Sequence, residues 1–302
     1  MQQTTRAALL ATALTVTATT LAPTAQADEN LLGYVKGAET LPKGAVEVYQ
    51  WLTLRSSKGQ GRYEAWDSKT EVEYGVSDRF SAFAAVKATD ITNRGLIVDG
   101  YLPLEGHFGP KLSGLEIGGK YNFLRPALDD FGLAANFEVS YDWVDPHSGQ
   151  DKDTISAELT FIGQKYFMEG RLIWVANAGF EATYADRAAI AGLPEDFDWP
   201  TDPEMEIELT FGTGLSYRFA PSWFLGAEIQ YQTEFETEVG QERWSVFAGP
   251  SLHYGGARWW ATLTWFPQIS GGGEMYPTQT HTGLHLIEKT RNEYRLKVGF
   301  NF

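Results

Sequence analysis

The chain has 302 residues, a formal net charge of -15 and no cysteine, which excludes disulfide bonds, thiolate nucleophiles and cysteine-based metal sites. The acidic balance argues against nucleic acid as a partner, because phosphate backbones favour Lys and Arg. Ten Trp, 14 Tyr and 18 Phe suit a protein that places amphipathic rings at two membrane interfaces.

The first 27 residues have the composition of a secretory signal peptide. Arg6 and the amino terminus supply positive charge, and a run rich in Ala, Leu, Thr and Val continues to Ala22. The sequence AQA at residues 25–27 then offers a small-x-small cleavage pattern. We therefore predict export, with residues 28–43 as an N-terminal periplasmic segment and a barrel over residues 44–302. The rest of the sequence contains no uncharged apolar run long enough for a membrane helix.

From Gly44 onward, apolar and polar residues alternate with period two in stretches of about ten to sixteen residues. This pattern predicts about twelve strands: Gly44–Arg55, Arg62–Gly75, Arg79–Thr89, Ser113–Phe123, Phe131–Val144, Thr154–Gly163, Gly170–Tyr184, Glu204–Phe219, Ser222–Phe235, Arg243–Tyr254, Arg258–Gln268 and Glu293–Phe302. Pro250 falls inside one of these strands and predicts a bulge or a weak point there, because proline cannot donate to the ladder.

The predicted connections alternate in length. Short turns such as 220–221 alternate with longer links such as Asp90–Leu112, Ala185–Pro203 and Ile269–Asn292. If both ends of an even-stranded barrel lie in the periplasm, every short turn is periplasmic and every longer loop is extracellular, as outer-membrane barrels prefer.

Each predicted strand has one apolar face and one charged face. A soluble lipocalin-like barrel with the apolar side inward is the alternative, but its interior would have to hold more aromatic volume than a barrel of this size encloses. The apolar face is therefore expected to contact lipid. The predicted fold class is all-β: a transmembrane antiparallel up-and-down β-barrel of about 12 strands in the cell outer membrane.

Two segments resemble known outer-membrane proteins. The C-terminal sequence RNEYRLKVGFNF alternates Tyr294, Leu296, Val298, Phe300 and Phe302 with polar or small residues, and resembles the C-terminal assembly signal of bacterial outer-membrane β-barrels. The segment YGVSDRFSAFAAVK resembles a turn-and-strand element of aromatic-degradation-type outer-membrane transporters of Gram-negative bacteria and their uncharacterised relatives. The resemblance implies a channel or transporter without a defined substrate.

The charged faces of the strands are expected to line the lumen. The candidate lumenal residues are Glu71, Glu73, Lys87, Glu116, Lys120, Glu138, Asp142, Glu158, Arg171, Glu181, Glu206, Glu208, Arg218, Glu228, Glu234, Arg243, Arg258, Arg295 and Lys297. One interpretation is a charged pathway that selects solutes by potential. The other is an internal network of ion pairs that fills and braces a narrow barrel. Twelve strands lie between filled eight-stranded barrels and open porins, so size does not decide between them.

Four other features bear on possible chemistry. The apolar Asp90–Leu112 link could enter the barrel mouth, pack on the rim or form an extra hairpin. His281 and His285, with Glu274 and Glu288 nearby, lie in a Gly-rich loop without a complete metal motif, and the acidic Ala185–Pro203 loop lacks calcium-loop spacing. No catalytic triad can be built on His147 and Ser148 or on Ser251 and His253. No metal, no cofactor and no enzymatic activity are predicted.

The most favoured function is a passive channel or transporter for a small solute. A non-conducting structural or surface-binding barrel is the alternative, and a rim or lumenal enzyme is third. The expected partners are outer-membrane lipid, the barrel-assembly machinery and a small solute. The sequence does not predict the oligomeric state.

Overall fold

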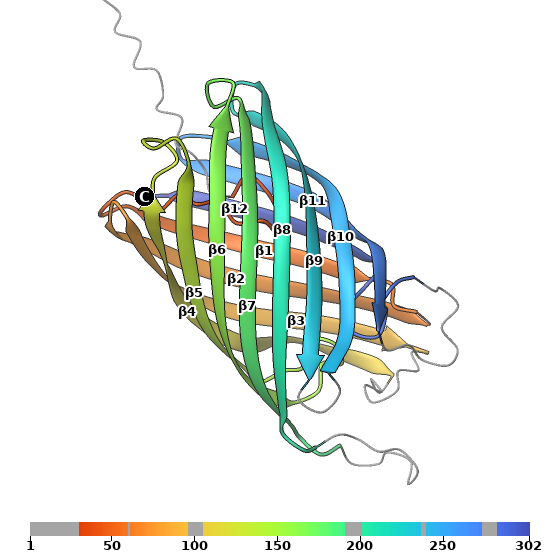
Figure 1. Ribbon diagram of the computed structural model, residues 1–302. Coiled ribbons are helices and arrows are strands. Elements are labelled where there is room, and N and C mark those ends of the chain that lie inside the picture. The colour runs from red at the N-terminus through yellow and green to blue at the C-terminus, as the bar shows by residue number, and fades with distance from the viewer. Residues whose placement is uncertain (1–29, 60, 96–104, 191–200, 237–239, 274–282) are drawn as a thin grey trace, which may run out of the picture.

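The computed structural model describes residues 30–59, 61–95, 105–190, 201–236, 240–273 and 283–302, which form twelve strands in one closed barrel (Figure 1). The strands are β1 (Val46–Ser56), β2 (Arg62–Ser77), β3 (Phe80–Arg94), β4 (Gly106–Leu124), β5 (Gly132–Asp142), β6 (Lys152–Phe167), β7 (Leu172–Arg187), β8 (Glu204–Ala220), β9 (Trp223–Glu236), β10 (Gly240–Gly255), β11 (Trp259–Gly273) and β12 (Asn292–Asn301). The predicted fold class is confirmed. None of the described residues forms a helix long and apolar enough to cross a membrane.

Every strand pairs antiparallel with its neighbours in sequence, and β1 pairs with β12 to close the ring. Closure satisfies the backbone groups of the first and last strands, which would otherwise present open edges. The expected irregularity at Pro250 is present. The β10–β11 ladder runs from Phe247 opposite Gln268 to Ser251 opposite Thr264, without paired residues between them.

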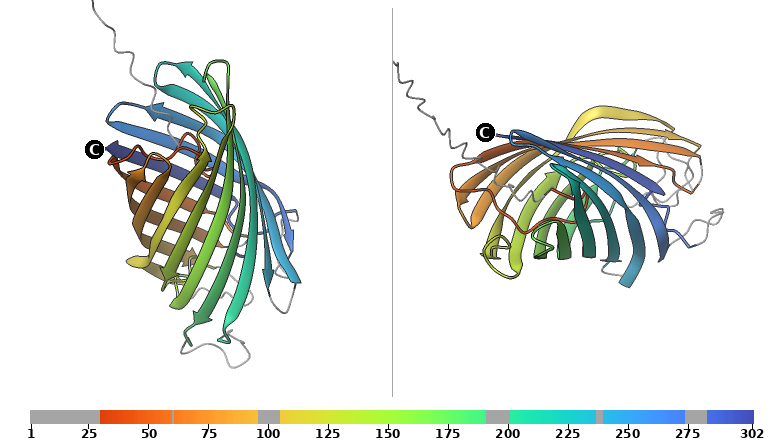
Figure 2. Two further views of the ribbon diagram at one scale, coloured as in Figure 1. Left: turned by 60° about the vertical axis from the view of Figure 1, so that its left-hand side comes forward. Right: turned by 90° about the horizontal axis from the view of Figure 1, so that it is seen from above.

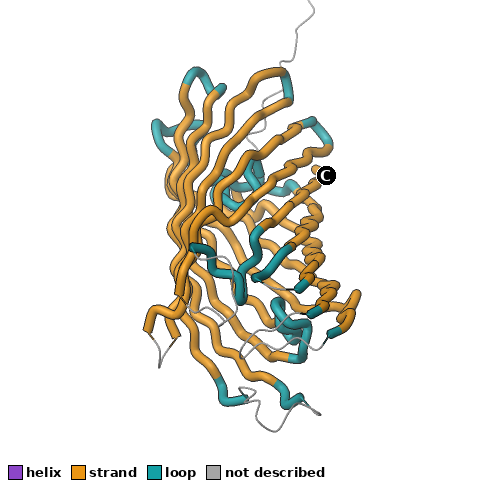
Figure 3. Tube along the Cα trace, turned by 90° about the vertical axis from the view of Figure 1, so that its right-hand side faces the viewer, coloured by secondary structure: helices purple, strands orange, loops and turns teal. Residues whose placement is uncertain are grey.

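The two ends of the barrel differ in their connections. The C-terminus and the short turns, such as the one between β8 and β9, lie at one end, which we call the turn end (Figures 1 and 2). The longer connections lie at the other end, the loop end (Figure 3). One connection is shorter than predicted, because β3 and β4 continue pairing as far as Asn93 opposite Gly106. Of the predicted Asp90–Leu112 link, residues 96–104 lie outside the described part of the chain.

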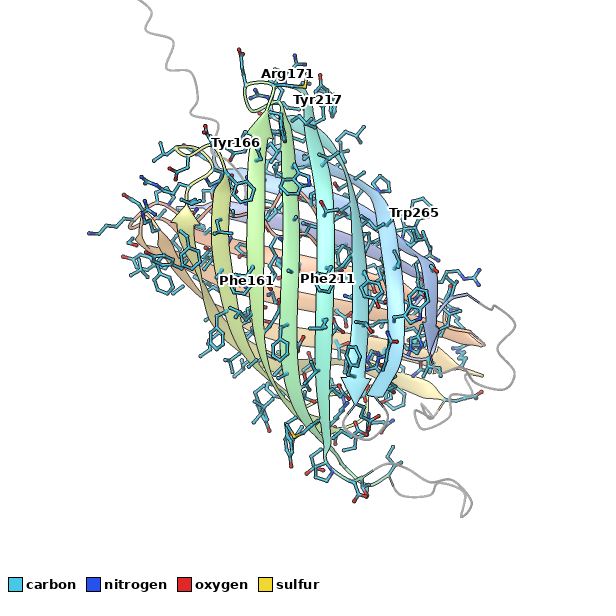
Figure 4. The ribbon with its side chains drawn as sticks, in the orientation of Figure 1. Phe161, Tyr166, Arg171, Phe211, Tyr217 and Trp265 are labelled. Atoms are coloured by element: carbon cyan, nitrogen blue, oxygen red, sulfur yellow. The ribbon has the colours of Figure 1, made fainter. Side chains whose placement is uncertain are left out.

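The outward face of the barrel is apolar and exposed. Phe161 on β6 and Phe211 on β8 project from the outer surface, with 51% and 50% of their areas accessible (Figure 4). The assembly-signal residues Tyr294, Leu296, Phe300 and Phe302 are also exposed, and Val298 is half-buried. A continuous apolar surface of this kind is costly in water, so the natural surroundings of the barrel wall are lipid.

Candidate functional site

Most of the charges predicted to be lumenal do point into the barrel. Eleven of them line one polar cavity of about 610 Å³, which we call the chamber: Lys87, Glu116, Glu138, Asp142, Glu158, Glu181, Glu206, Glu208, Glu234, Arg243 and Arg295. Four more line a second cavity of about 40 Å³ nearer the turn end: Glu71, Glu73, Lys120 and Lys297. Arg171 and Arg258 lie instead in exposed turns, outside the lumen, and Arg218 is half-buried near the turn end of β8. Arg171 donates there to Tyr217 Oη at 2.7 Å (Figure 4).

Five glutamates form a continuous row across five adjacent strands. Strand pairing places neighbouring members directly opposite each other in the order Glu138, Glu158, Glu181, Glu208 and Glu234, from β5 to β9. We call this set the acidic row. Residues opposite each other in a ladder have Cβ atoms only about 5 Å apart, and like charges there are destabilising. A row of five such side chains is therefore not explained by packing within the sheet.

Cations reach this row from outside it. Lys36 Nζ lies 2.5 Å from Glu138 and 3.5 Å from Glu158, and Lys289 Nζ lies 3.3 Å from Glu208. Glu181, at the centre of the row, accepts a 3.4 Å hydrogen bond from Thr183 and has no ion-pair partner within the described part of the chain. Glu234 pairs with Arg243 of β10, whereas the cations at Glu138, Glu158 and Glu208 come from segments that are not strands.

A complementary row follows the opposite wall. We call this set the basic row. Its members pair in register on four adjacent strands: Lys297 on β12, Trp51 on β1, Lys69 on β2 and Lys87 on β3. Lys69 and Lys297 lie 4.2 and 4.4 Å from the Trp51 ring centroid, where the π face favours a cation. In a ring of twelve strands β1 lies opposite β7 and β2 lies opposite β8. The chamber therefore separates a mainly acidic wall from a mainly basic and aromatic wall.

Residues 30–43, which we call the plug segment, run inside the barrel at its turn end. In the view from above they cross the opening of the barrel as an irregular red segment (Figure 2). Leu31, Leu32, Val35 and Ala38 pack into an apolar cluster with wall residues that include Ile162 and Val175. Tyr34 and Lys36 line the floor of the chamber. Of the segment predicted as periplasmic, residues 30–41 lie inside the lumen near the turn end, whereas Pro42 and Lys43 are exposed at the rim.

The plug segment is fixed by Glu228 of β9. The Glu228 carboxylate accepts the backbone N–H groups of Gly33, Tyr34 and Val35 at 2.7, 2.8 and 2.9 Å. The Tyr34 ring stacks on Phe266 at a centroid distance of 4.2 Å. Glu228 is one of the predicted lumenal residues, and the structure shows that it holds a peptide segment, which the sequence did not indicate.

Two connections fold inward at the loop end. In residues 283–291, Leu286, Ile287 and Glu288 are almost fully buried, and Ile287 packs with Tyr63, Ala65, Ile91 and Phe108. The connection after β5 also bends into the mouth, where Pro146 O accepts hydrogen bonds from Arg55 at 2.6 Å and Tyr63 at 3.2 Å. The chamber is therefore bounded by the plug segment at one end and by these two connections at the other.

We expect the connection at His147 to loosen in acid. Burial lowers the pKa of His147 well below its ordinary 6.5, and the positive charges of Lys58 and Arg55 lower it further. The unfolded loop takes up a proton near pH 6.5 while the folded loop does not, so loop stability is complete above that pH and falls as pH decreases. The amide protection factors of residues 143–151, which correct the exchange rate for the slower intrinsic exchange in acid, should decrease between about pH 7 and pH 5. In His147→Gln most of this pH dependence should vanish; an unchanged pH profile in that variant would contradict the assignment.

The histidines outside the chamber, with their Ser and Glu neighbours, bind within the loops and the wall. His281 and Glu274 lie outside the described residues, and His285 binds Gln268 through its backbone. Within the described part of the chain, no group of three His, Asp or Glu side chains could hold a metal ion. His253 Nδ1 lies 2.7 Å from Thr262 Oγ1, and the backbone N–H groups of His147 and Ser148 bind Asp145.

The acidic Ala185–Pro203 connection is described only at its two ends, since residues 191–200 lie outside the described part of the chain. At those ends Arg187 and Glu204 form an ion pair, and Lys152 lies 3.9 Å from the same Glu204 carboxylate. This carboxylate is therefore compensated by protein cations.

Comparison with known proteins gives a family and a fold. The chain belongs to the family described as Family of unknown function (DUF6662), whose model matches residues 24–302. No curated protein matches the sequence.

Solved outer-membrane barrels share the architecture. The COG4313 outer membrane channel from Pseudomonas putida F1 is 11% identical with a TM-score of 0.61, over 88% of this chain and 98% of that chain. The beta domain of the Bordetella autotransporter BrkA is 13% identical with a TM-score of 0.53, over 86% and 100%. The translocator domain of autotransporter NalP from Neisseria meningitidis is 11% identical with a TM-score of 0.52, over 88% and 91%. At these identities the likeness concerns the fold alone.

Proposed function

We propose that this member of the DUF6662 family is a passive channel or transporter for a small solute in the bacterial outer membrane. The observation that carries the proposal is the charge-segregated chamber inside a barrel whose outer face is apolar. A polar cavity of about 610 Å³ can hold a hydrated small solute. Opposed rows of charge create a field across that path, which selects solutes by the sign and arrangement of their charges.

The proposed orientation has the turn end in the periplasm and the loop end outside the cell. Alternating connection lengths support it, because outer-membrane barrels keep short turns on the periplasmic side. Export by the signal peptide at residues 1–27, which lie outside the described residues, is part of the proposal. In this orientation the plug segment closes the pathway from the periplasmic side. The segment YGVSDRFSAFAAVK, which resembles aromatic-degradation-type transporters, supports a transport role without defining the solute.

A non-conducting structural barrel is the second candidate. The observation in its favour is the density of buried ion pairs, such as Arg243 with Glu234 and Glu288, which can serve to brace a filled lumen. A permanently seated plug segment would serve the same end. An enzyme at the rim or in the lumen ranks third. Ser251 Oγ has no hydrogen-bond partner among the described residues, and a serine nucleophile needs a neighbouring base to activate it.

The two leading candidates are separated by releasing the plug segment. Leu32 is 1% exposed in an apolar pocket, and a Cβ added at Gly33 would lie 2.5 Å from Thr264 Oγ1. The double variant Leu32→Asp, Gly33→Val should therefore leave the wall intact and expel the segment, since a buried unpaired carboxylate is very costly. In planar bilayers we expect small or brief currents from the natural protein and at least about tenfold larger mean conductance from the variant, since 1.4 kcal/mol of seating energy already gives that factor. Correctly folded protein without current in either form would favour the structural barrel.

A further inference from the structure

The wall of the lumen binds the plug segment through its backbone. Besides the three N–H groups held by Glu228, the Asn177 amide forms a double contact with residue 36. Asn177 Oδ1 accepts the Lys36 N–H at 2.6 Å, and Asn177 Nδ2 donates to the Lys36 carbonyl at 2.9 Å. Gln164 Oε1 accepts the N–H of Ala38 at 2.7 Å. These contacts come from β9, β7 and β6, so they follow the segment across the wall.

The backbone carbonyls of the segment are held in the same way. Lys297 Nζ donates to Leu32 O at 3.2 Å, and Lys120 Nζ donates to Glu39 O at 2.9 Å. Asn122 Nδ2 donates to Ala38 O at 2.8 Å. Lys297 and Lys120 are 3% and 6% exposed, so two buried cationic side chains donate hydrogen bonds to peptide carbonyls. Such contacts do not depend on the side chains of the bound segment.

Apolar side chains of the segment fit where the wall has glycines. A Cβ added at Gly214 or Gly226 would lie 2.4 or 2.7 Å from Leu32, and one added at Gly212 would lie 3.1 Å from Val35 Cγ2. Backbone hydrogen bonds that give affinity, with pockets for a few side chains, are how proteins recognise extended peptides.

We propose that this surface is a peptide-binding site and that the solute of the channel is a short peptide, with the plug segment as a tethered competitor. The inference rests on the proposed channel function. A peptide offers the N–H and C=O groups that Glu228, Asn177 and Lys297 hold, whereas a sugar offers hydroxyls and a polyamine offers only cations. The chamber beside the site fits the same class, because a peptide carries an ammonium group suited to the acidic row and a carboxylate suited to the basic row.

The test uses the full-length Leu32→Asp, Gly33→Val variant, whose wall residues are unchanged. The first probe is a synthetic peptide NLLGYVKGA, which repeats residues 30–38. The second is an unrelated peptide of equal length with apolar residues at the positions of Leu32 and Val35. Maltohexaose and spermidine are the non-peptide probes. We expect both peptides to block the current at concentrations at least about tenfold lower than maltohexaose or spermidine. N-methylation of the peptide at the positions of residues 33–35 removes the donors to Glu228 and should weaken the block by at least about tenfold, as should Glu228→Gln in the wall.

Failure of the inference is distinct from failure of the channel. Equal block by maltohexaose or spermidine, or block that ignores both N-methylation and Glu228→Gln, would overturn the peptide site while conduction remains. If the variant carries no current, binding of a fluorescein-labelled NLLGYVKGA peptide is measured by anisotropy in detergent micelles. Saturable binding that N-methylation weakens would support the site in a non-conducting barrel, and absence of binding would overturn it. Should the double variant fold poorly, Gly33→Val alone serves in both measurements.

Discussion

Arg243→Met is expected to lower the free energy of unfolding by about 3–5 kcal/mol, because it strands buried carboxylates. The Arg243 side chain is 6% exposed and pairs with Glu234 of the acidic row, with Glu242 at 2.9 Å and with Glu288 of the inward-folded 283–291 connection. Removing one cation therefore leaves three carboxylates without it and detaches that connection from the wall. The measurement is urea unfolding of the barrel in micelles, read as loss of the compact band on a gel.

Two controls distinguish charge from packing. Arg62→Met removes an ion pair with Glu64 at 3.2 Å whose side chains are 67% and 38% exposed, so it should change stability by less than about 1 kcal/mol. Adding Glu234→Gln and Glu288→Gln to Arg243→Met neutralises two stranded carboxylates and should recover part of the loss. If Arg243→Met is no more harmful than Arg62→Met, the lumenal ion pairs do not brace this barrel.

Period-two alternation was enough to predict the barrel and the inward direction of most charges. Glu138, Glu181 and Glu234 are far apart in sequence, but each stands on the polar parity of its own strand. The sequence could not predict that these glutamates lie side by side in one row, because that depends on the register between neighbouring strands. Register is set by hydrogen bonding and turn geometry across the whole ring, and a shift of two residues would preserve the parity but break the row.

The sequence predicted a segment between the signal peptide and the barrel, but not that this plug segment lies inside the lumen. Residues 30–43 have no strand period, so the sequence indicated only a connection between the signal peptide and the barrel. Their position depends on Glu228, which is almost two hundred positions away, and on Gly214 and Gly226. The one available signal was the run of glycines on the lumenal parity of β8 and β9, where each marks a close approach of another segment. The 283–291 connection was missed for the same reason, since the described apolar residues that pack against Ile287 belong to β2, β3 and β4.

The largest expected functional change comes from Glu228→Gln. The natural carboxylate accepts three backbone N–H groups, whereas an amide side chain accepts through one oxygen and turns an N–H₂ toward the remaining donors. With its oxygen at the Oε2 position the amide keeps the Tyr34 and Val35 N–H groups and loses the one from Gly33. Hydrogen bonds to a charged acceptor contribute about 1.5–3 kcal/mol each and neutral ones about 0.5–1.5 kcal/mol, so one lost bond and two weakened bonds should cost the seated state about 3 kcal/mol or more. That loss corresponds to about a hundredfold increase in the released population of the plug segment.

Release of the plug segment can be measured without conductance, because the protein has no cysteine of its own. Ala38 is fully buried in the seated segment, so Ala38→Cys gives a single thiol that a polar maleimide reaches only after release. The labelling rate should rise by about a hundredfold when Glu228→Gln is added, since labelling follows the open population. Glu181→Gln is the matched control: it neutralises another lumenal glutamate that makes no hydrogen bond to the plug segment, so the labelling rate should stay within about threefold of the Ala38→Cys parent. Equal acceleration by both variants would mean that lumenal charge in general, and not the Glu228 clamp, holds the segment in the barrel.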